Sequence, residues 1–316
     1  MKAIVAGAGS IGRRHVAALL SRPDVDRVTV VTSWPGAAAA LPADTRLAIA
    51  APGDPVDADI AIVAVETDRH IATATQLVEA GIDTLIEKPL SHSREGLDEL
   101  AAAARQSGVL ACVGYNLRFL PALAVLREAV ASGTLGRVLY ARFEAGQYLP
   151  DWRPDRDYRE IYSASRARGG GVALDLSHEV DAMRFVLGDP VDWQVVSRHV
   201  SDLAIESDDI FEGLYDYDGG AIAAVHLDYL APRLVRAYRV LGEDGDMLVD
   251  VANARTVLTT RSEVRVTEDP AQFAVGATYP AQLDAFLAAR GGAETPIATL
   301  ADGIRVLDLL EDSHAR

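Results

Sequence analysis

Cysteine is nearly absent from this sequence of 316 residues, in which Cys112 is the only one. A single cysteine excludes an intramolecular disulfide and cannot supply a structural zinc cluster by itself. Because Cys112 lies within an apolar run, we expect it to be a small residue of the core.

Basic residues are scarce relative to acidic ones: 30 Lys and Arg stand against 46 Asp and Glu, which gives a net charge of -16. Binding to nucleic acid or to an anionic membrane normally requires a basic patch, so we expect neither partner. No apolar run approaches the ~20 residues of a membrane span, and the first predicted strand begins too early to leave room for a signal peptide. These absences predict a cytoplasmic protein.

The first residues carry the most informative pattern. An apolar run over residues 2–6 is followed by a glycine turn, Gly7-Ala8-Gly9-Ser10-Ile11-Gly12, and then by a helical pattern from Arg13. Gly7 suits the tight turn, Gly9 lets the backbone approach a pyrophosphate, and Gly12 lets the helix pack on the strand. The sequence therefore predicts a dinucleotide site that includes Gly7, Gly9, Ser10, Ile11 and Gly12.

The choice between NAD and NADP stays open. A second apolar run, residues 28–31, leads into Thr32 and Ser33, where an NAD-specific fold usually has an acidic residue on the ribose. Two hydroxyls tolerate a 2'-phosphate, and Arg13 or Arg14 could neutralise it; the alternative is that both arginines are simply solvated. We assign Thr32 and Ser33 to the cofactor, which is NAD or NADP.

Apolar runs alternate with helical patterns through the first 118 residues. The strand-like runs are residues 59–65, 83–86 and 109–113, and this alternation indicates a Rossmann-type, doubly wound parallel sheet. Ligands of such sheets bind beyond the carboxyl ends of the strands. We therefore assign Glu66, His70, Glu87 and Lys88 to the cofactor and Arg118 to the substrate.

Past Gly136 the pattern changes to strand-like stretches separated by turns, with little helix between them. This predicts an α+β second domain, residues 119–316, with a large and mostly antiparallel sheet. Two helices, residues 280–289 and 300–312, close the chain, and we expect the last of them to be able to pack back on the first domain.

Lys88 ends a predicted strand in Glu87-Lys88-Pro89, where it could reach a substrate on the nicotinamide. Hydride removal from a carbinol carbon requires a base for the hydroxyl proton, and the reverse reaction requires an acid. Glu87 could orient the ammonium. A surface Lys-Pro turn is the competing interpretation.

A second cluster follows three glycines, Gly169 to Gly171. Asp175, His178 and Asp181 are spaced by three, so one continuous helix would bring them to a common face. We expect Asp175 and His178 to bind a sugar hydroxyl and assist Lys88. No second histidine lies at ligand spacing, so we expect no metal; a capped helix N-terminus is the structural alternative.

A loop over residues 147–168 gathers five arginines and four aromatic residues. Arginine forks suit carboxylate or phosphate, and aromatic faces suit sugar rings. From this loop we assign Tyr148, Trp152 and Arg153 to an anionic carbohydrate. Alternatively, the arginines pair with the acids of the loop or with another subunit.

These motifs together resemble the Gfo/Idh/MocA family, the relatives of glucose-fructose oxidoreductase and inositol dehydrogenase. The resemblance covers essentially the whole chain: residues 7–15, the helix start at His70, Glu87-Lys88-Pro89, residues 115–121, residues 169–181 and Tyr279-Pro280. It implies that Lys88 is the catalytic acid or base, that Asp175 and His178 contact the substrate, and that the protein forms a homodimer or homotetramer.

One spacing departs from that family, because three steps rather than four separate Asp175 from His178. The variant Asp175-Leu176-Ser177-His178-Glu179, with the segment Tyr-Leu-Pro-Asp-Trp-Arg-Pro at residues 148–154 upstream, resembles a branch that acts on sialic-acid-like and other surface sugars. The sequence as a whole predicts an NAD(P)-dependent sugar dehydrogenase. An NAD-dependent glycosidase that uses transient oxidation and a non-catalytic cofactor-binding sensor are the alternatives.

Overall fold

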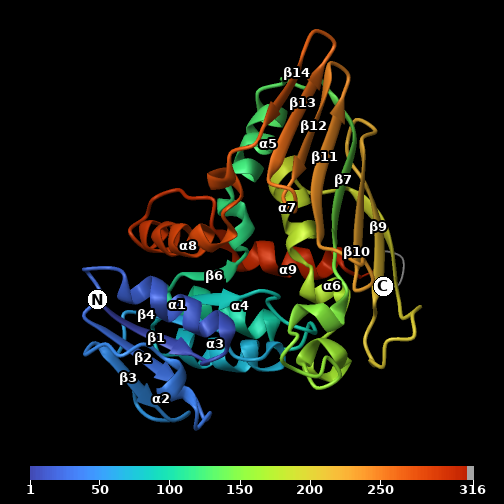
Figure 1. Cartoon of the computed structure of the whole chain (residues 1–316). Coiled ribbons are helices and arrows are strands. Elements are labelled where there is room, and N and C mark those ends of the chain that lie inside the picture. Colours follow the sequence, from blue (N-terminus) through green and yellow to red (C-terminus); the bar gives the residue numbers. More distant parts are fainter. Residues whose placement is uncertain (312–316) are drawn as a thin grey trace. The chain divides into compact units, whose positions relative to one another are not determined.

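The computed structural model describes residues 1–311 and divides the chain into two compact units (Figure 1). The first comprises residues 1–116 and 277–304, and the second comprises residues 117–276 with the described residues from 305 onward. Residues 312–316 lie outside the described part. They belong to the predicted second domain, and the first of them, Asp312, ends the predicted last helix.

The first unit contains a seven-stranded sheet with the order β15-β6-β5-β4-β1-β2-β3. Its strands are β1 (Lys2–Ala6), β2 (Arg27–Val31), β3 (Leu47–Ala50), β4 (Ile60–Val63), β5 (Asp83–Glu87), β6 (Ala111–Gly114) and β15 (Ala298–Thr299). Strands β1 to β6 pair in parallel and only β15 is antiparallel to its neighbour. The predicted doubly wound sheet is confirmed, and its order reverses between β1 and β4.

Helices of the first unit are α1 (Ser10–Leu20), α2 (Ala37–Ala40), α3 (His70–Glu79), α4 (Leu97–Ser107), most of α8 (Val275–Arg290) and the start of α9 (Leu300–Leu309). Helix α4 begins directly after Gly96, whose left-handed φ of 76° lies outside right-handed helical geometry. Helix α8 begins before Pro280, so this proline lies inside the helix rather than at its start.

Cys112 lies in β6 and is fully buried, as expected of a residue of the core. Its burial raises the pKa of the thiol to about 12.

The second unit contains an eight-stranded sheet with the order β14-β13-β12-β11-β7-β10-β9-β8. Its strands are β7 (Val138–Gly146), β8 (Asp192–Arg198), β9 (Ile210–Asp216), β10 (Ile222–Asp228), β11 (Val235–Gly242), β12 (Gly245–Asp250), β13 (Arg255–Thr260) and β14 (Val264–Thr267). Only β7 and β10 pair in parallel, so the predicted, mostly antiparallel sheet is confirmed.

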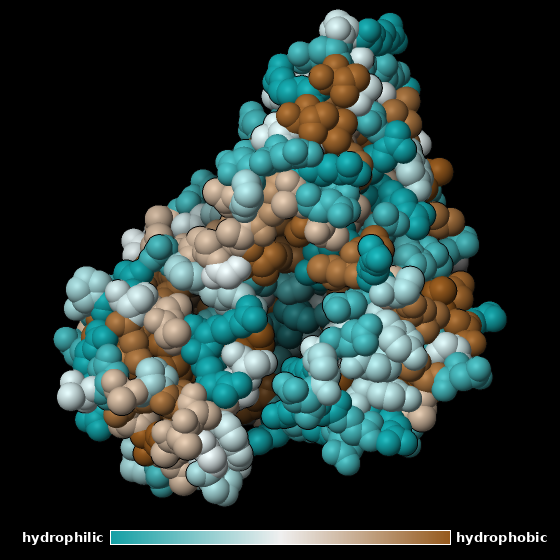
Figure 2. All heavy atoms as spheres, in the orientation of Figure 1, coloured by the Kyte–Doolittle hydropathy of each residue, from teal (hydrophilic) through white to brown (hydrophobic). Residues whose placement is uncertain are grey.

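One face of this second sheet is covered by helices α5 (Pro121–Ala131), α6 (Val172–Asp175) and α7 (His178–Leu187). Alternate residues of β7, namely Ala141, Phe143 and Ala145, are buried on that side, as the two-residue period of a strand requires. The opposite face carries exposed apolar side chains, among them Leu214 and Val196, and Figure 2 shows further apolar side chains over the end formed by β13 and β14. The oligomer that the family resemblance implies stays a prediction.

A histidine and two carboxylates form a charged cluster on this sheet. Nδ1 of His226 lies 2.6 Å from Oε1 of Glu212, and its Nε2 lies 3.1 Å from Oδ2 of Asp228. The hydrogen bond to Asp228 and the charge of Glu212 raise the pKa of His226 above its ordinary value of 6.5. The protonated ring therefore stabilises the folded state.

We predict that His226→Gln destabilises the protein more at pH 5.5 than at pH 9. A raised pKa in the folded state contributes stability that is fully present below the unfolded pKa and is lost as the pH rises through the folded pKa. The expected loss at pH 5.5 is about 1 kcal/mol or less, because Glu212 is half exposed and solvent screens the pair. Urea unfolding at both pH values measures it, with the exposed His92→Gln as the control; equal losses at both pH values would contradict the prediction.

Candidate active site

The glycine turn after β1 lies at the point where the strand order of the first sheet reverses. Gly7 has a φ of 110°, and a Cβ there would come closer than 3.0 Å to the carbonyl oxygen of Ala64 at the end of β4. A Cβ on Gly12 would come equally close to the oxygen of Gly7. Side chains at these two positions would separate β1, α1 and β4, so both glycines are required by packing.

Gly9 serves a different purpose. No atom lies within 4 Å of the position that its Cβ would occupy, and the residue is exposed. Helix α1 begins at the next residue, and its hydrogen bonding starts when Arg13 donates to the oxygen of Gly9 at 3.0 Å. The amides of Ser10, Ile11 and Gly12 belong to the first turn, which suits a pyrophosphate. This open cradle before a helix N-terminus fits a dinucleotide.

The end of β2 presents hydroxyl groups rather than an acid. Thr32 is half-buried, donates its N–H to the oxygen of Ala50 at 3.0 Å, and accepts a hydrogen bond from the N–H of Trp34 on Oγ1. Ser33 is exposed, as are Arg13 and Arg14 on α1. The guanidinium of Arg14 lies 5.4 Å from the ring centre of Tyr279.

Lys88 is half-buried and follows the last residue of β5, with Glu87 buried before it. Oε1 of Glu87 lies 2.6 Å from Nε2 of His15 on α1. The Lys88–Pro89 peptide bond is cis, and the oxygen of Pro89 lies 2.9 Å from Nδ1 of His70. Glu66 is exposed, whereas His70 is buried, and burial lowers the pKa of its ring.

Asp175, His178 and Asp181 do not lie on one continuous helix. Helix α6 ends at Asp175 and α7 begins at His178, because Leu176 leaves helical geometry with a ψ of 26°. The glycines before α6 pack too tightly for side chains: a Cβ on Gly170 would strike the oxygens of Tyr162 and Ser163, and one on Gly171 would strike the carboxylate of Asp208.

Asp175 is buried against two tyrosines of the second unit. The hydroxyl of Tyr229 donates to its Oδ2 at 2.5 Å, and Tyr162 also bonds to this carboxylate. Burial and the charge of Asp175 raise the pKa values of both phenols well above 10, so both stay protonated donors. The ring of Trp152 packs edge-on against Tyr229, with centroids 5.2 Å apart.

His178 is half-buried, and the carboxylates that follow it are paired inside the second unit. Glu179 is fully buried and accepts from Nε of Arg236 at 2.7 Å and from the hydroxyl of Tyr238 at 3.2 Å. Asp181 accepts two bonds from Nε and one from a terminal nitrogen of Arg118. Arg118 thus has a structural role, and its assignment to the substrate stays a prediction.

The loop residues assigned to the substrate differ in exposure. Tyr148 and Arg153 are exposed, and Trp152 donates from its indole nitrogen to the oxygen of Gln147 at 3.1 Å. The positive charge of Arg153 acts on Tyr162, which bonds to Asp175. Arg159 instead pairs with Asp157 within the loop, as the alternative interpretation anticipates for the arginines.

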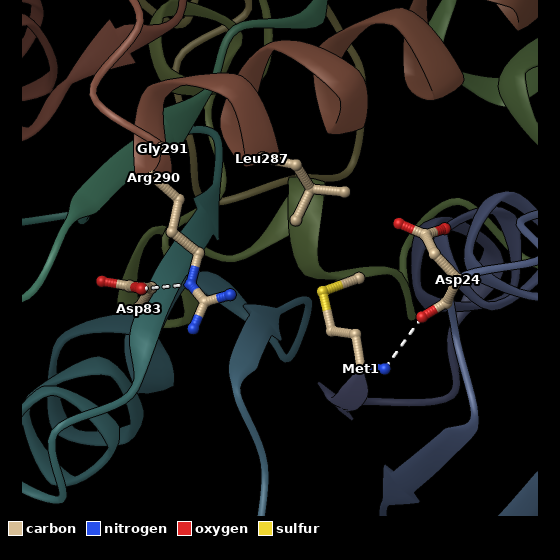
Figure 3. A pocket seen from close by; sticks show the side chains of 6 residues that line it. All are labelled: Met1, Asp24, Asp83, Leu287, Arg290 and Gly291. Carbon is tan, nitrogen blue, oxygen red and sulfur yellow. Dashed lines mark hydrogen bonds and ion pairs between the residues drawn. The ribbon is translucent and has the colours of Figure 1, made fainter.

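A depression at the other edge of the first sheet is not this site. It is lined by Met1, Asp24, Asp83, Leu287, Arg290 and Gly291 (Figure 3). Asp83 is the first residue of β5, so the depression lies at the amino ends of the strands, whereas dinucleotides bind beyond the carboxyl ends.

Among residues 1–311, no group of three histidine, cysteine or acidic side chains is arranged to hold a metal ion. None of the helices in this part of the chain has the length and apolar character of a membrane span.

Sequence reasoning misses His15, Glu179, Tyr162 and Tyr229 as parts of these clusters. His15 does lie three residues after Gly12, one helical turn along, which is a local signal. The partners of the other three, such as Arg236 for Glu179, are distant in sequence, so no spacing rule could find them.

We predict that Gly9→Ala and Gly12→Ala fail for different reasons. Gly9→Ala keeps its fold, because its φ is -66° and its surroundings are open, yet it weakens NADH binding by obstructing the approach of the pyrophosphate. Gly12→Ala loses about 1–3 kcal/mol of stability through overpacking. Thermal unfolding and NADH fluorescence titration measure the two effects; unchanged NADH affinity in Gly9→Ala would contradict the assignment of the cradle.

Comparison with known proteins identifies both units. Residues 1–115 match an oxidoreductase family with an NAD-binding Rossmann fold, and residues 123–248 match the GFO/IDH/MocA C-terminal domain. A 1,5-anhydro-D-fructose reductase of Ensifer adhaerens is 30% identical over 269 residues, which cover 80% of this chain and 75% of that protein.

Solved structures share the fold over nearly the whole chain. Levoglucosan dehydrogenase in complex with NADH and levoglucosan has a TM-score of 0.84 at 19% identity, covering 98% of this chain and 95% of that one. The WlbA dehydrogenase of Bordetella pertussis, in complex with NADH and UDP-GlcNAcA, has a TM-score of 0.81 at 20% identity, covering 98% and 93%. With an NAD-binding Rossmann unit followed by the matching C-terminal domain, the chain belongs to the Gfo/Idh/MocA family of oxidoreductases.

Proposed function

We propose that this protein transfers a hydride between NAD and a hydroxyl-bearing carbon of a sugar or sugar derivative, with Lys88 as general acid and base. The observation that carries the proposal is the position of Lys88: it follows β5 at the carboxyl edge of the sheet in the NAD-binding unit, between residues held by buried histidines. The reductase relative and the levoglucosan complex support a sugar as the substrate class.

Bound NAD supplies the hydride acceptor, and its reduced form supplies the donor. A side chain of the protein then has to accept one proton, because oxidation of a carbinol carbon leaves a protonated carbonyl unless a base takes the hydroxyl proton. Lys88 accepts that proton in the direction of oxidation and returns it in the direction of reduction. A lysine suits both roles once desolvation and neighbouring charge bring its pKa toward neutrality.

The second unit supplies the groups that bind the sugar in this proposal. The two tyrosines hold Asp175 in one orientation, and the carboxylate has further acceptor capacity for a sugar hydroxyl. His178 is half-buried at the start of α7, two residues beyond the break in the helix. A fixed carboxylate and an imidazole can orient a hydroxyl as donor and as acceptor.

We further propose that the substrate carries a negative charge near Arg153. This arginine is exposed yet close enough to the buried cluster to act on Tyr162, whereas Arg159 is paired with Asp157. A guanidinium can bind a carboxylate in bidentate fashion, so it would distinguish an acidic sugar from its neutral counterpart. The nucleotide-sugar acid in the WlbA complex is one compound of this class.

We predict that Lys88→Ala lowers kcat by about 10²- to 10⁴-fold, the contribution typical of acid–base catalysis, with little change in NADH affinity. Turnover is measured by nicotinamide absorbance with NAD and NADP against levoglucosan, myo-inositol, 1,5-anhydro-D-fructose and a panel of acidic and nucleotide sugars. Lys2→Arg is the control, because Lys2 lies on the surface beside Asp57. Unchanged turnover in Lys88→Ala would remove Lys88 from the mechanism.

We also predict that Arg153→Ala raises KM for an acidic sugar about 10-fold, the factor lost with one charge-assisted hydrogen bond. KM for the matched neutral sugar stays within about twofold, since no charge is lost there. Arg156→Ala, in the same exposed loop, is the control. Equal effects of Arg153→Ala on both sugars would argue against a charged substrate.

A further inference from the structure

Lys88 is one of only two lysines in the sequence, and the other, Lys2, pairs with Asp57 at 2.5 Å on the surface of the same unit. An acid–base group must be held in place, because a misplacement of about 1 Å can cost 10²-fold in rate. The side chain of a lysine has four rotatable bonds, so its main chain has to be fixed well if its ammonium is to be. The two residues that flank Lys88, Glu87 and Pro89, each contact a buried histidine.

On the amino side, Glu87 is held by His15. Their 2.6 Å contact joins a ring that is fully buried to a carboxylate that is 8% exposed. Among residues 1–311, Nδ1 of His15 has no hydrogen-bond partner, so the polar contact of this ring is with Glu87. The other oxygen of Glu87 accepts from the N–H of Lys88 at 3.3 Å. Glu87 therefore connects α1 to the backbone of Lys88.

The neighbouring strand leaves room for this carboxylate. A Cβ on Gly114 of β6 would lie 3.1 Å from Cα, Cδ and Oε1 of Glu87, tighter than most real contacts. The position of the Glu87 side chain thus depends on its contact with His15 on one side and on the glycine at position 114 on the other.

On the carboxyl side, Pro89 is held by His70. The ring of His70 is 2% exposed, with Nδ1 2.9 Å from the oxygen of Pro89 and Nε2 3.2 Å from the oxygen of Val65. Burial lowers the pKa of this ring, which favours its neutral form with a single N–H. The shorter contact indicates that Nδ1 donates that proton to Pro89.

We propose that His15 and His70 are positioning residues, which clamp the main chain on either side of Lys88, through Glu87 and through Pro89. The proposal rests on the proposed function for its catalytic consequence but not for its geometry. In this proposal α1, the helix that follows the glycine turn, also helps to fix the main chain of Lys88 through the contact of His15 with Glu87.

The two contacts use different ring nitrogens, and this gives matched variants. The amide nitrogen of glutamine takes the place of Nε2 and that of asparagine takes the place of Nδ1. His15→Gln should therefore retain the bond to Glu87, and His15→Asn should lose it. At position 70 the order is reversed: His70→Asn should retain the bond to Pro89 and His70→Gln should lose it.

The first test is acetylation of the full-length protein with an N-hydroxysuccinimide ester, without added nucleotide, followed by mass spectrometry. Lys2 is the internal standard, since only two side-chain amines compete. We expect His15→Asn and His70→Gln to raise the rate at Lys88 relative to Lys2 by about fivefold, the factor that one lost hydrogen bond is worth. His15→Gln and His70→Asn should stay near the wild-type ratio.

A variant that leaves both histidines in place provides a second route. Gly114→Ala crowds Glu87 from β6, and we expect it to raise the labelling ratio as His15→Asn does. Unchanged ratios in all these variants, or identical ratios within each Gln and Asn pair, would overturn the clamp.

The second test is turnover with the sugar that gives the highest rate in the panel. We expect His15→Asn and His70→Gln to lower kcat by about 10- to 100-fold with little change in KM, and their partner variants to restore it. If Lys88→Ala keeps its activity, the proposed function fails while the labelling result stands. If Lys88→Ala is inactive and the labelling ratios do not change, the clamp alone fails.

Discussion

The close approach of the glycine turn to the end of β4 is the constraint on which the NAD-binding unit depends. Gly7 and Gly12 allow β1, α1 and β4 to meet at the point where the strand order reverses, and no residue with a Cβ fits there. That contact places the first turn of α1 at the carboxyl edge of the sheet. It also brings His15, one turn further along α1, to the carboxylate that precedes Lys88. The glycines that let the strands and α1 pack together therefore also place the helix that contacts Glu87, the residue before Lys88.

The second unit solves a different problem, which is to bury acidic side chains without leaving them unpaired. Each of the three carboxylates around the break between α6 and α7 has its own donors: tyrosines for Asp175, Arg236 and Tyr238 for Glu179, and Arg118 for Asp181. An unpaired charge in such a place would cost several kcal/mol. These pairs fix the orientation of the segment that carries His178, although the segment is not one regular helix.

The sequence predicts the elements governed by local rules. Continuous apolar runs mark β4 and β5, alternation marks the strands of the second sheet, and the glycine spacing marks the turn before α1. It does not predict the break at Leu176, because the spacing of Asp175, His178 and Asp181 fits one helix as well as two. It also misses the parallel pairing of β7 with β10 and the partners of the buried carboxylates, since these depend on residues brought together from distant parts of the chain.

The return of residues 277–304 to the first unit has a consequence for the order in which the protein is made. Strand β15 pairs with the edge of β6, Thr278 binds Asn116, and Arg290 binds Asp83. The NAD-binding unit therefore lacks an edge strand and a buried hydrogen bond until nearly the whole chain has left the ribosome. During synthesis its six parallel strands remain incompletely covered while residues 117–276 are made, and the second unit is completed later still, because the residues from 305 onward belong to it.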